Sequence, residues 1–181
     1  MLIHRIAAPF AAFVFAACGG QARGPEGSTI ADPTARADLR DTAGTQVGVA
    51  SFTMAGGEGQ LGISVSGLAP GEHGMHIHET GACTPPSFES AGGHFNPASR
   101  QHGILNPEGP HAGDLPNLVV KADGSADTTV AVSAGLLSEG TGSMIGGESR
   151  AFVIHADPDD QRTDPSGNSG ARVVCGVIER R

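Results

Sequence analysis

Short apolar runs alternate with turn residues along most of the chain. Between residues 61 and 65, Leu, Ile and Val alternate with Gly and Ser, which is the period-two pattern of a strand with one buried face. No segment shows a sustained 3.6-residue apolar period, so long helices are not expected. Similar runs predict eight strands in all, at 34–41, 46–54, 61–66, 73–79, 118–122, 126–133, 149–155 and 171–178.

The spacing of these strands favours an all-β domain. We expect an eight-stranded antiparallel Greek-key flattened barrel, an immunoglobulin-like sandwich. The segments 118–122 and 126–133 flank Asp123-Gly124 and are predicted to pair as a hairpin. Residues 80–114 and 156–170 contain no convincing strand, and such long loops are unusual in a compact domain unless something orders them. These two stretches are therefore predicted to be functional loops.

The N-terminus has the features of a targeting segment. A short basic start precedes residues 6–17, a mostly apolar run of about twelve residues that is too short to span a bilayer. Two alanines then precede Cys18, which resembles the lipobox of bacterial lipoproteins. We predict a signal peptide over 1–17 and a lipidated Cys18 that begins a flexible tether over 18–33. Cleavage without lipid is the alternative. Residues 34–181 would form one folded domain.

The net charge narrows the possible partners, and the cysteine content indicates the redox conditions in which the protein folds. The formal net charge is −8 among 181 residues, which argues against nucleic acid as a partner. Three cysteines are present, and lipidation of Cys18 would leave Cys83 and Cys175 as a pair. An exported protein experiences oxidising conditions, so we expect these two to form a disulfide. Two unrelated buried thiols are the alternative.

Histidines provide the candidate chemistry. Six of the eight lie between residues 73 and 111. Successive side chains of a strand point to opposite faces, so His76 and His78 share one face, about 7 Å apart, and could converge on one metal ion. An exposed polar face is the alternative interpretation of that pair. His73 points the other way and is predicted to be a structural, hydrogen-bonded histidine.

A second group of possible ligands follows along the chain. His94, His102, His111 and Asp114 provide three imidazoles and a carboxylate, a closed tetrahedral set suited to zinc. Each of these residues alone would be weak evidence for a metal, and only their combination is specific.

Five separated motifs together resemble one family. They are Gly74-Met-His-Ile-His-Glu79, Gly92-Gly-His-Phe-Asn-Pro97, His111-Ala-Gly-Asp114, Val153-Ile-His155 and Gly167-Asn-Ser-Gly-Ala-Arg-Val-Val-Cys-Gly176. In this order they are similar to the copper,zinc superoxide dismutases, from about Thr34 to the C-terminus. The resemblance implies one copper and one zinc ion per subunit and supports the predicted Greek-key fold.

The resemblance also implies a role for each motif residue. It implies copper ligands at His76, His78, His94 and His155, and zinc ligands at His94, His102, His111 and Asp114. His94 would bridge both ions and supply a proton during catalysis, and Arg172 would dock the superoxide anion. Asp159 would link His76 to His102 and fix their ring orientation. Cys83 and Cys175 would form the disulfide that holds the first loop against the barrel.

The implied activity is disproportionation of superoxide to O2 and H2O2, which would protect the cell envelope. The expected location is the periplasm or cell envelope, with membrane contact only through the lipid. A homodimer is expected, with a monomer as the alternative. A catalytically inactive metal-binding or copper-delivery module on the same barrel is the alternative function. The segment 157–168 contains Arg162 but no lysine, which leaves open where extra steering charge for the anion would come from.

Overall fold

The computed structural model describes residues 34–181 except 139 and 141. The predicted signal peptide, Cys18 and the tether lie outside the described residues. The strands are β1 (Ala35–Asp41), β2 (Gln46–Ala55), β3 (Glu58–Val65), β4 (Gly71–His73), β5 (Met75–His78), β6 (Leu118–Val120), β7 (Ala126–Val132), β8 (Arg150–His155) and β9 (Arg172–Arg180). Two short 3-10 helices, η1 (Glu89–Ala91) and η2 (Ala134–Leu137), accompany them.

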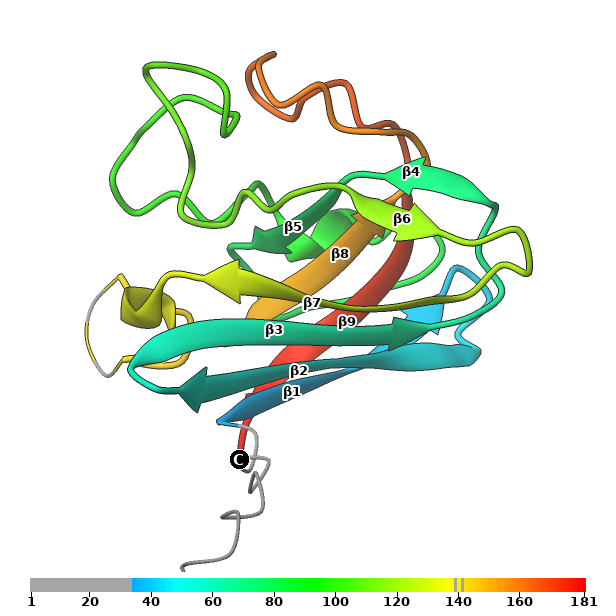
Figure 1. Cartoon of the computed structure of the whole chain (residues 1–181), viewed down its shortest axis with the longest axis horizontal. Coiled ribbons are helices and arrows are strands. Elements are labelled where there is room, and N and C mark those ends of the chain that lie inside the picture. The colour runs from blue at the N-terminus through cyan, green and yellow to red at the C-terminus, as the bar shows by residue number, and fades with distance from the viewer. Residues whose placement is uncertain (1–33, 139, 141) are drawn as a thin grey trace, which may run out of the picture. The chain divides into compact units, whose positions relative to one another are not determined.

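The strands form one large antiparallel sheet and one small sheet. The large sheet has the order β5-β8-β9-β1-β2-β3-β7, and β4 pairs with β6 in the small sheet. Figure 1 shows the large sheet curled on itself, with the small sheet near its edge strands β5 and β7. The all-β prediction is confirmed.

The predicted strand 73–79 divides in two, so the described part of the chain has nine strands rather than eight. Gly74 separates β4 from β5. Its N–H donates to the carbonyl of Asp157, and its own carbonyl accepts from the N–H of His155. This backbone is therefore bonded to the end of β8 and the loop beyond it, while β4 turns away to pair with β6.

The predicted hairpin of 118–122 with 126–133 is wrong. The turn itself forms, because the N–H of Lys121 donates to the carbonyl of Ser125 at 2.8 Å. The strands beyond it separate, since β6 pairs with β4 and β7 pairs with β3 over seven residue pairs. β6 has only three residues, so pairing with it would leave most of β7 and the edge of β3 without partners.

Side-chain alternation builds the core as predicted. Leu61, Ile63 and Val65 of β3 are at most 3% exposed and pack in the main cluster together with Met75 and Ile77 of β5. β8 is buried on both faces. Its Phe152 and Ile154 join the main core, while Ala151 and Val153 join a second small cluster with Phe88, Ala91 and Cys175. That second cluster packs the first long loop against the back of β8 and β9.

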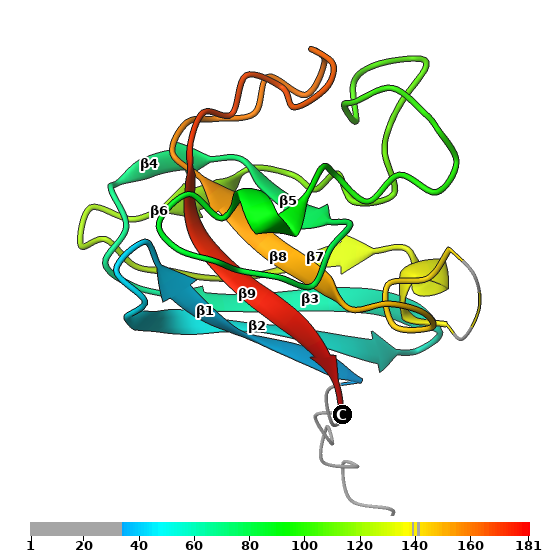
Figure 2. The ribbon, with the colours of Figure 1, turned by 180° about the vertical axis from the view of Figure 1, so that it is seen from behind.

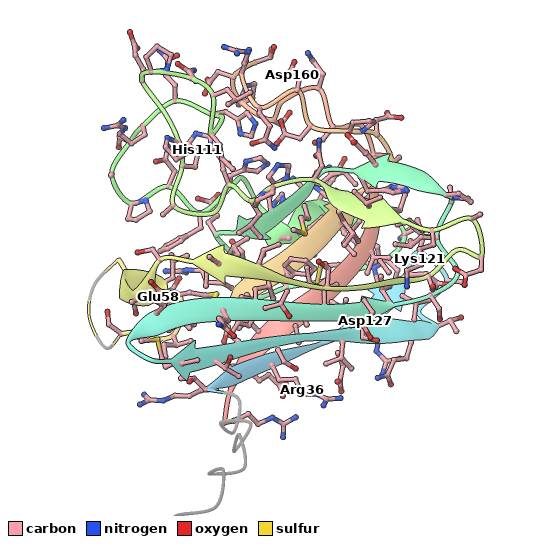
Figure 3. All side chains as sticks on the ribbon, viewed as in Figure 1. Arg36, Glu58, His111, Lys121, Asp127 and Asp160 are labelled. Carbon is pink, nitrogen blue, oxygen red and sulfur yellow. A yellow bond between two sulfur atoms is a disulfide. The ribbon has the colours of Figure 1, made fainter. Side chains whose placement is uncertain are left out.

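Both predicted long loops lie at one end of the sheet. Figures 1 and 2 show segment 156–170 and the later part of segment 80–114 at the end opposite the C-terminus, whereas the part of the first loop that contains η1 lies across β8 and β9. In Figure 3, His111 of the first loop and Asp160 of the second lie at this end, while Arg36 lies at the other. Among the described residues, no helix is long and apolar enough to cross a membrane.

Candidate metal centre

The free edge of β5 positions the first loop. The N–H of Ile77 donates to the carbonyl of Gly113, and the carbonyl of Ile77 accepts from the N–H of Phe95, both at 2.9 Å. These bonds place His94 beside His78 and Asp114 beside His76 as isolated bridges. A Cβ on Gly113 would lie 2.2 Å from the carbonyl oxygen of Ile77, so the close approach requires glycine.

Four histidines converge above β5 and the end of β8. His76, His78, His94 and His155 offer ligand atoms that all lie within 4.8 Å of one another. In each ring one nitrogen is bonded and the other is buried without a partner. The partnerless atoms are His76 Nδ1, His78 Nε2, His94 Nε2 and His155 Nε2.

Those four unpartnered nitrogens show that the site suits a metal ion. The bonded nitrogens fix the tautomers, since His78 Nδ1 donates to the Gly92 carbonyl at 3.0 Å and His155 Nδ1 to the Gly170 carbonyl at 3.2 Å. Each remaining nitrogen then presents a lone pair to the same buried space. Buried polar atoms are normally satisfied, and a shared cation satisfies all four together.

A second group shares His94. The Nδ1 atoms of His94 and His102 each lie 3.0 Å from Asp114 Oδ1, and His111 Nδ1 lies 3.2 Å from the same oxygen. His76 also falls within 4.8 Å of His94, His102 and Asp114. The predicted ligand His111 is not among these four, although its Nδ1 lies 3.4 Å from His94 Nδ1, and His76 Nε2 is already bonded to Asp159. Three nitrogens and one oxygen fit a tetrahedral cation.

Asp159 connects the two groups from behind. Its Oδ2 accepts from His76 Nε2 at 2.7 Å, and its Oδ1 accepts from His102 Nε2 at 3.0 Å. All three side chains are fully buried. A carboxylate in this position orients both rings and makes their other nitrogens more basic. The sequence prediction for Asp159 named these same two partners.

The protonation states differ between the two groups. Burial lowers the pKa of His78 to about 2, of His155 to about 3 and of His94 to about 4, so these rings are neutral at pH 7. Burial also acts against a charge on His102, but hydrogen bonds to Asp114 and Asp159 outweigh it and raise its pKa to about 9. In the metal-free protein His102 is therefore a cation between two carboxylates.

Arg172 is attached to the backbone of the first loop. Its two terminal nitrogens donate to the carbonyls of Phe88 at 2.7 Å and Gly92 at 2.6 Å. The Gly92 carbonyl also accepts from His78, so one carbonyl oxygen links the guanidinium to a histidine of the first group. This position places a fixed positive charge beside the four converging nitrogens.

The predicted disulfide is present between Cys83 and Cys175. Cys175 is on β9, three residues after Arg172, and Cys83 begins the loop segment whose carbonyls hold that arginine. His73 is buried as predicted, and its ring nitrogens bond to the carbonyls of His155 and Ala69.

Two residues that position the site were missed by sequence analysis. Asn117 exchanges two 2.9 Å hydrogen bonds with the backbone of Asp159. Asp164 accepts from the N–H of His102 at 2.7 Å and thereby joins the two loops. Both contacts are between segments far apart in the chain, and no local pattern indicates them.

The chain is similar in sequence to known proteins over most of its length. The family described as copper/zinc superoxide dismutase (SODC) matches residues 46–178. The chain is 43% identical to Superoxide dismutase [Cu-Zn] 2 of Aquifex aeolicus, with 81% of this chain and 87% of the relative covered. It is 46% identical to the superoxide dismutase-like protein YojM of Bacillus subtilis, over 75% of this chain and 70% of that protein.

Solved structures show the same fold. A SOD-like protein from Bacillus subtilis superposes with a TM-score of 0.75 at 43% identity, covering 78% of this chain and 96% of that one. The Cu/Zn superoxide dismutase from Brucella abortus gives 0.65 at 31% identity, covering 80% and 98%. The matched region includes both long loops and every histidine of the two groups, so the chain belongs to the copper/zinc superoxide dismutase family.

Proposed function

We propose that this protein disproportionates superoxide to O2 and H2O2. The observation that carries the proposal is the set of four buried, unpartnered imidazole nitrogens that converge within 4.8 Å and share His94 with a carboxylate-containing group. An acid-base or nucleophilic site would not need four such nitrogens aimed at one point.

The donor sets distinguish the two metals. Four imidazole nitrogens suit Cu(II), so copper is assigned to His76, His78, His94 and His155. Three imidazoles with one carboxylate suit zinc, which is assigned to His94, His102, His111 and Asp114. When bound, copper supplies the one-electron exchange that converts one superoxide to O2 and the next to H2O2.

The protein's own residues manage charge and protons. His94 presents one nitrogen to each group, so it would be a ligand of both ions, and its Nε2 could carry a proton for the peroxide product when it is not bound to copper. Arg172 provides the cation that attracts and orients the substrate anion. Asp159 holds the rings of His76 and His102 in one orientation, which limits the rearrangement needed between the two half-reactions.

Export and membrane anchoring belong to the same proposal. We propose that residues 1–17 are a signal peptide, that Cys18 carries lipid and that 18–33 tether the domain in the cell envelope, where it would remove superoxide. The Cys83–Cys175 disulfide supports an oxidising compartment. Cys18→Ser should move the protein from the membrane fraction to the soluble fraction. We also propose a homodimer, which light scattering on the purified domain would test.

A metal-binding module without turnover is the second candidate, because one relative bears the name superoxide dismutase-like. The enzyme and the metal-binding module differ in whether they need the positive charge of Arg172. A storage or delivery module does not need an anion-docking cation beside the copper ligands, whereas an enzyme with an anionic substrate does.

Superoxide decay measured on the chain from residue 19 onward, loaded with copper and zinc, tests the proposal. We expect rapid decay, almost none for the metal-free protein, and almost none for His155→Ala. Arg172→Glu should retain both metals but lose most of the rate. Lys121→Glu makes the same change of charge on the turn after β6, away from the loops (Figure 3), and should have little effect. Equal rates for Arg172→Glu and the parent would refute the docking role.

A further inference from the structure

A cavity of about 460 Å³ opens between the segment that follows Cys83 and the start of β9. Its lining includes Glu89, Arg172 and Gly170. The Gly170 carbonyl accepts from His155, and Arg172 shares the Gly92 carbonyl with His78. The cavity lining is therefore linked to His155 by one hydrogen bond and to His78 by two, which meet at the Gly92 carbonyl.

The cavity lining contains one cation and one anion. Arg172 directs its terminal nitrogens at the carbonyls of Phe88 and Gly92, and these two residues flank η1, which begins at Glu89. Among the described residues, no ion pair within 4.0 Å joins Glu89 to Arg172. The carboxylate of Glu89 is exposed to solvent and is not neutralised by contact.

The two charges nevertheless act on the same region. Burial lowers the pKa of the Arg172 guanidinium, and the negative charge of Glu89 opposes that shift. Burial lowers the pKa of His78 and His155 as well, and the positive charge of Arg172 adds to both shifts. A small anion near Arg172 and the four nitrogens would therefore meet attraction from Arg172 and repulsion from Glu89.

We propose that Glu89 weakens the attraction of Arg172 for small anions and so limits both the affinity of the proposed copper site for anions and the rate of superoxide capture. The statement about superoxide rests on the proposed function, whereas the statement about anion affinity requires only bound copper. Glu89 is not a catalytic residue in this proposal. It lowers the electrostatic potential around Arg172.

The expected size of the effect follows from Coulomb's law. Removing one unit charge several ångströms from the path of a monovalent anion changes its local concentration by about two- to threefold in a water-like dielectric. Screening should reduce the change strongly above physiological ionic strength, where the Debye length falls below about 8 Å.

The test uses azide as the probe anion and copper,zinc-loaded protein. Azide binding is followed by the change in copper absorption, and superoxide decay is measured on the same samples at roughly 0.01 M and 0.5 M ionic strength. Glu89→Gln should bind azide about two- to threefold more tightly at low ionic strength, and Glu89→Lys should extend the change in the same direction. Glu58→Gln removes the same charge from the start of β3, outside the cavity, and should match the parent.

Two results would overturn the inference. One is azide affinity in Glu89→Gln equal to that of the parent at low ionic strength. The other is a gain of equal size at high ionic strength, which would indicate a rearranged loop rather than a charge effect. Failure of the proposed function has a different signature, because the parent would then bind azide but leave superoxide decay at the uncatalysed rate.

Discussion

Replacing both cysteines of the disulfide tests how the first loop is held. In Cys83→Ala/Cys175→Ala the chain loses a cross-link between residues separated by 92 positions. In the chain-entropy model, a cross-link that closes a loop of that length stabilises the fold by about 4.6 kcal/mol at 25 °C, because it restricts the unfolded chain. The double variant should lose that stabilisation. Both alanines are compatible with the small apolar cluster of Phe88, Ala91 and Val153, so packing contributes little to the difference.

The assay is urea or thermal unfolding of the metal-free chain from residue 19, compared between the parent and the double variant. A loss of about 4.6 kcal/mol should lower Tm by roughly 10–15 °C for a domain of this size. A thiol reductant should bring the parent to the stability of the variant and leave the variant unchanged. The reasoning is refuted if the double variant unfolds within about 1 kcal/mol of the parent.

The same variant carries a functional consequence. The carbonyls of Phe88 and Gly92 that hold Arg172 belong to the segment that the disulfide attaches to β9. Without the cross-link, that segment is attached by its small apolar cluster and by hydrogen bonds from Arg172, His78 and Thr80. We therefore expect the metal-loaded variant to keep copper and lose several-fold in superoxide decay rate. An unchanged rate would show that the hydrogen bonds alone position the guanidinium.

Three further predictions concern the metal centre and the residues that support it. The pKa of His102 is raised to about 9, so its ring is protonated at pH 7. Zinc binding at pH 7 should therefore release about one proton. Zinc affinity should rise about tenfold per pH unit up to about pH 9 and then level off. Titration calorimetry in two buffers of different ionisation enthalpy checks this, and a heat independent of buffer would contradict it. Asp159→Asn should weaken metal binding by about 10- to 100-fold, measured by competition with a chelator, because its amide cannot accept from both rings. Gly167→Ala should destabilise the domain by more than about 2 kcal/mol, since φ is +62° and the new Cβ would lie 1.7 Å from Asp159 Oδ1. Gly44→Ala, at φ +82° in open space, should lose only about 1 kcal/mol in the same denaturant titration.

Local pattern predicted those parts of the molecule that local chemistry determines. Strand periodicity located the core face of β3 and separated His76 and His78 from Met75 and Ile77. The pairing of β6 and β7 could not be obtained in this way. An Asp-Gly turn favours a hairpin, but β3 offers β7 a seven-residue partner and β4 offers β6 a matching three-residue partner. The longer set of backbone hydrogen bonds determined the arrangement.

The positioning residues show a second limit of sequence patterns. Asp159 was predicted because the motif around His155 resembles a known family. Asn117 and Asp164 contribute in a similar way, by fixing the backbone of Asp159 and of His102, yet neither belongs to one of the five motifs. Their contacts depend on where two irregular loops meet. That meeting point is determined by the fold and not by any spacing along the chain.

One set of backbone hydrogen bonds both protects the edge of the sheet and builds the site. β5 is an edge strand, and an uncovered edge exposes unpaired backbone groups. The first loop covers that edge through Gly93, Phe95 and Gly113. The same pairing sets His94 against His78 and Asp114 against His76, so the edge cannot be covered in another register without separating the two groups. Because His94 belongs to both groups, a slip of one residue would turn its ring to the other face and remove one donor from each.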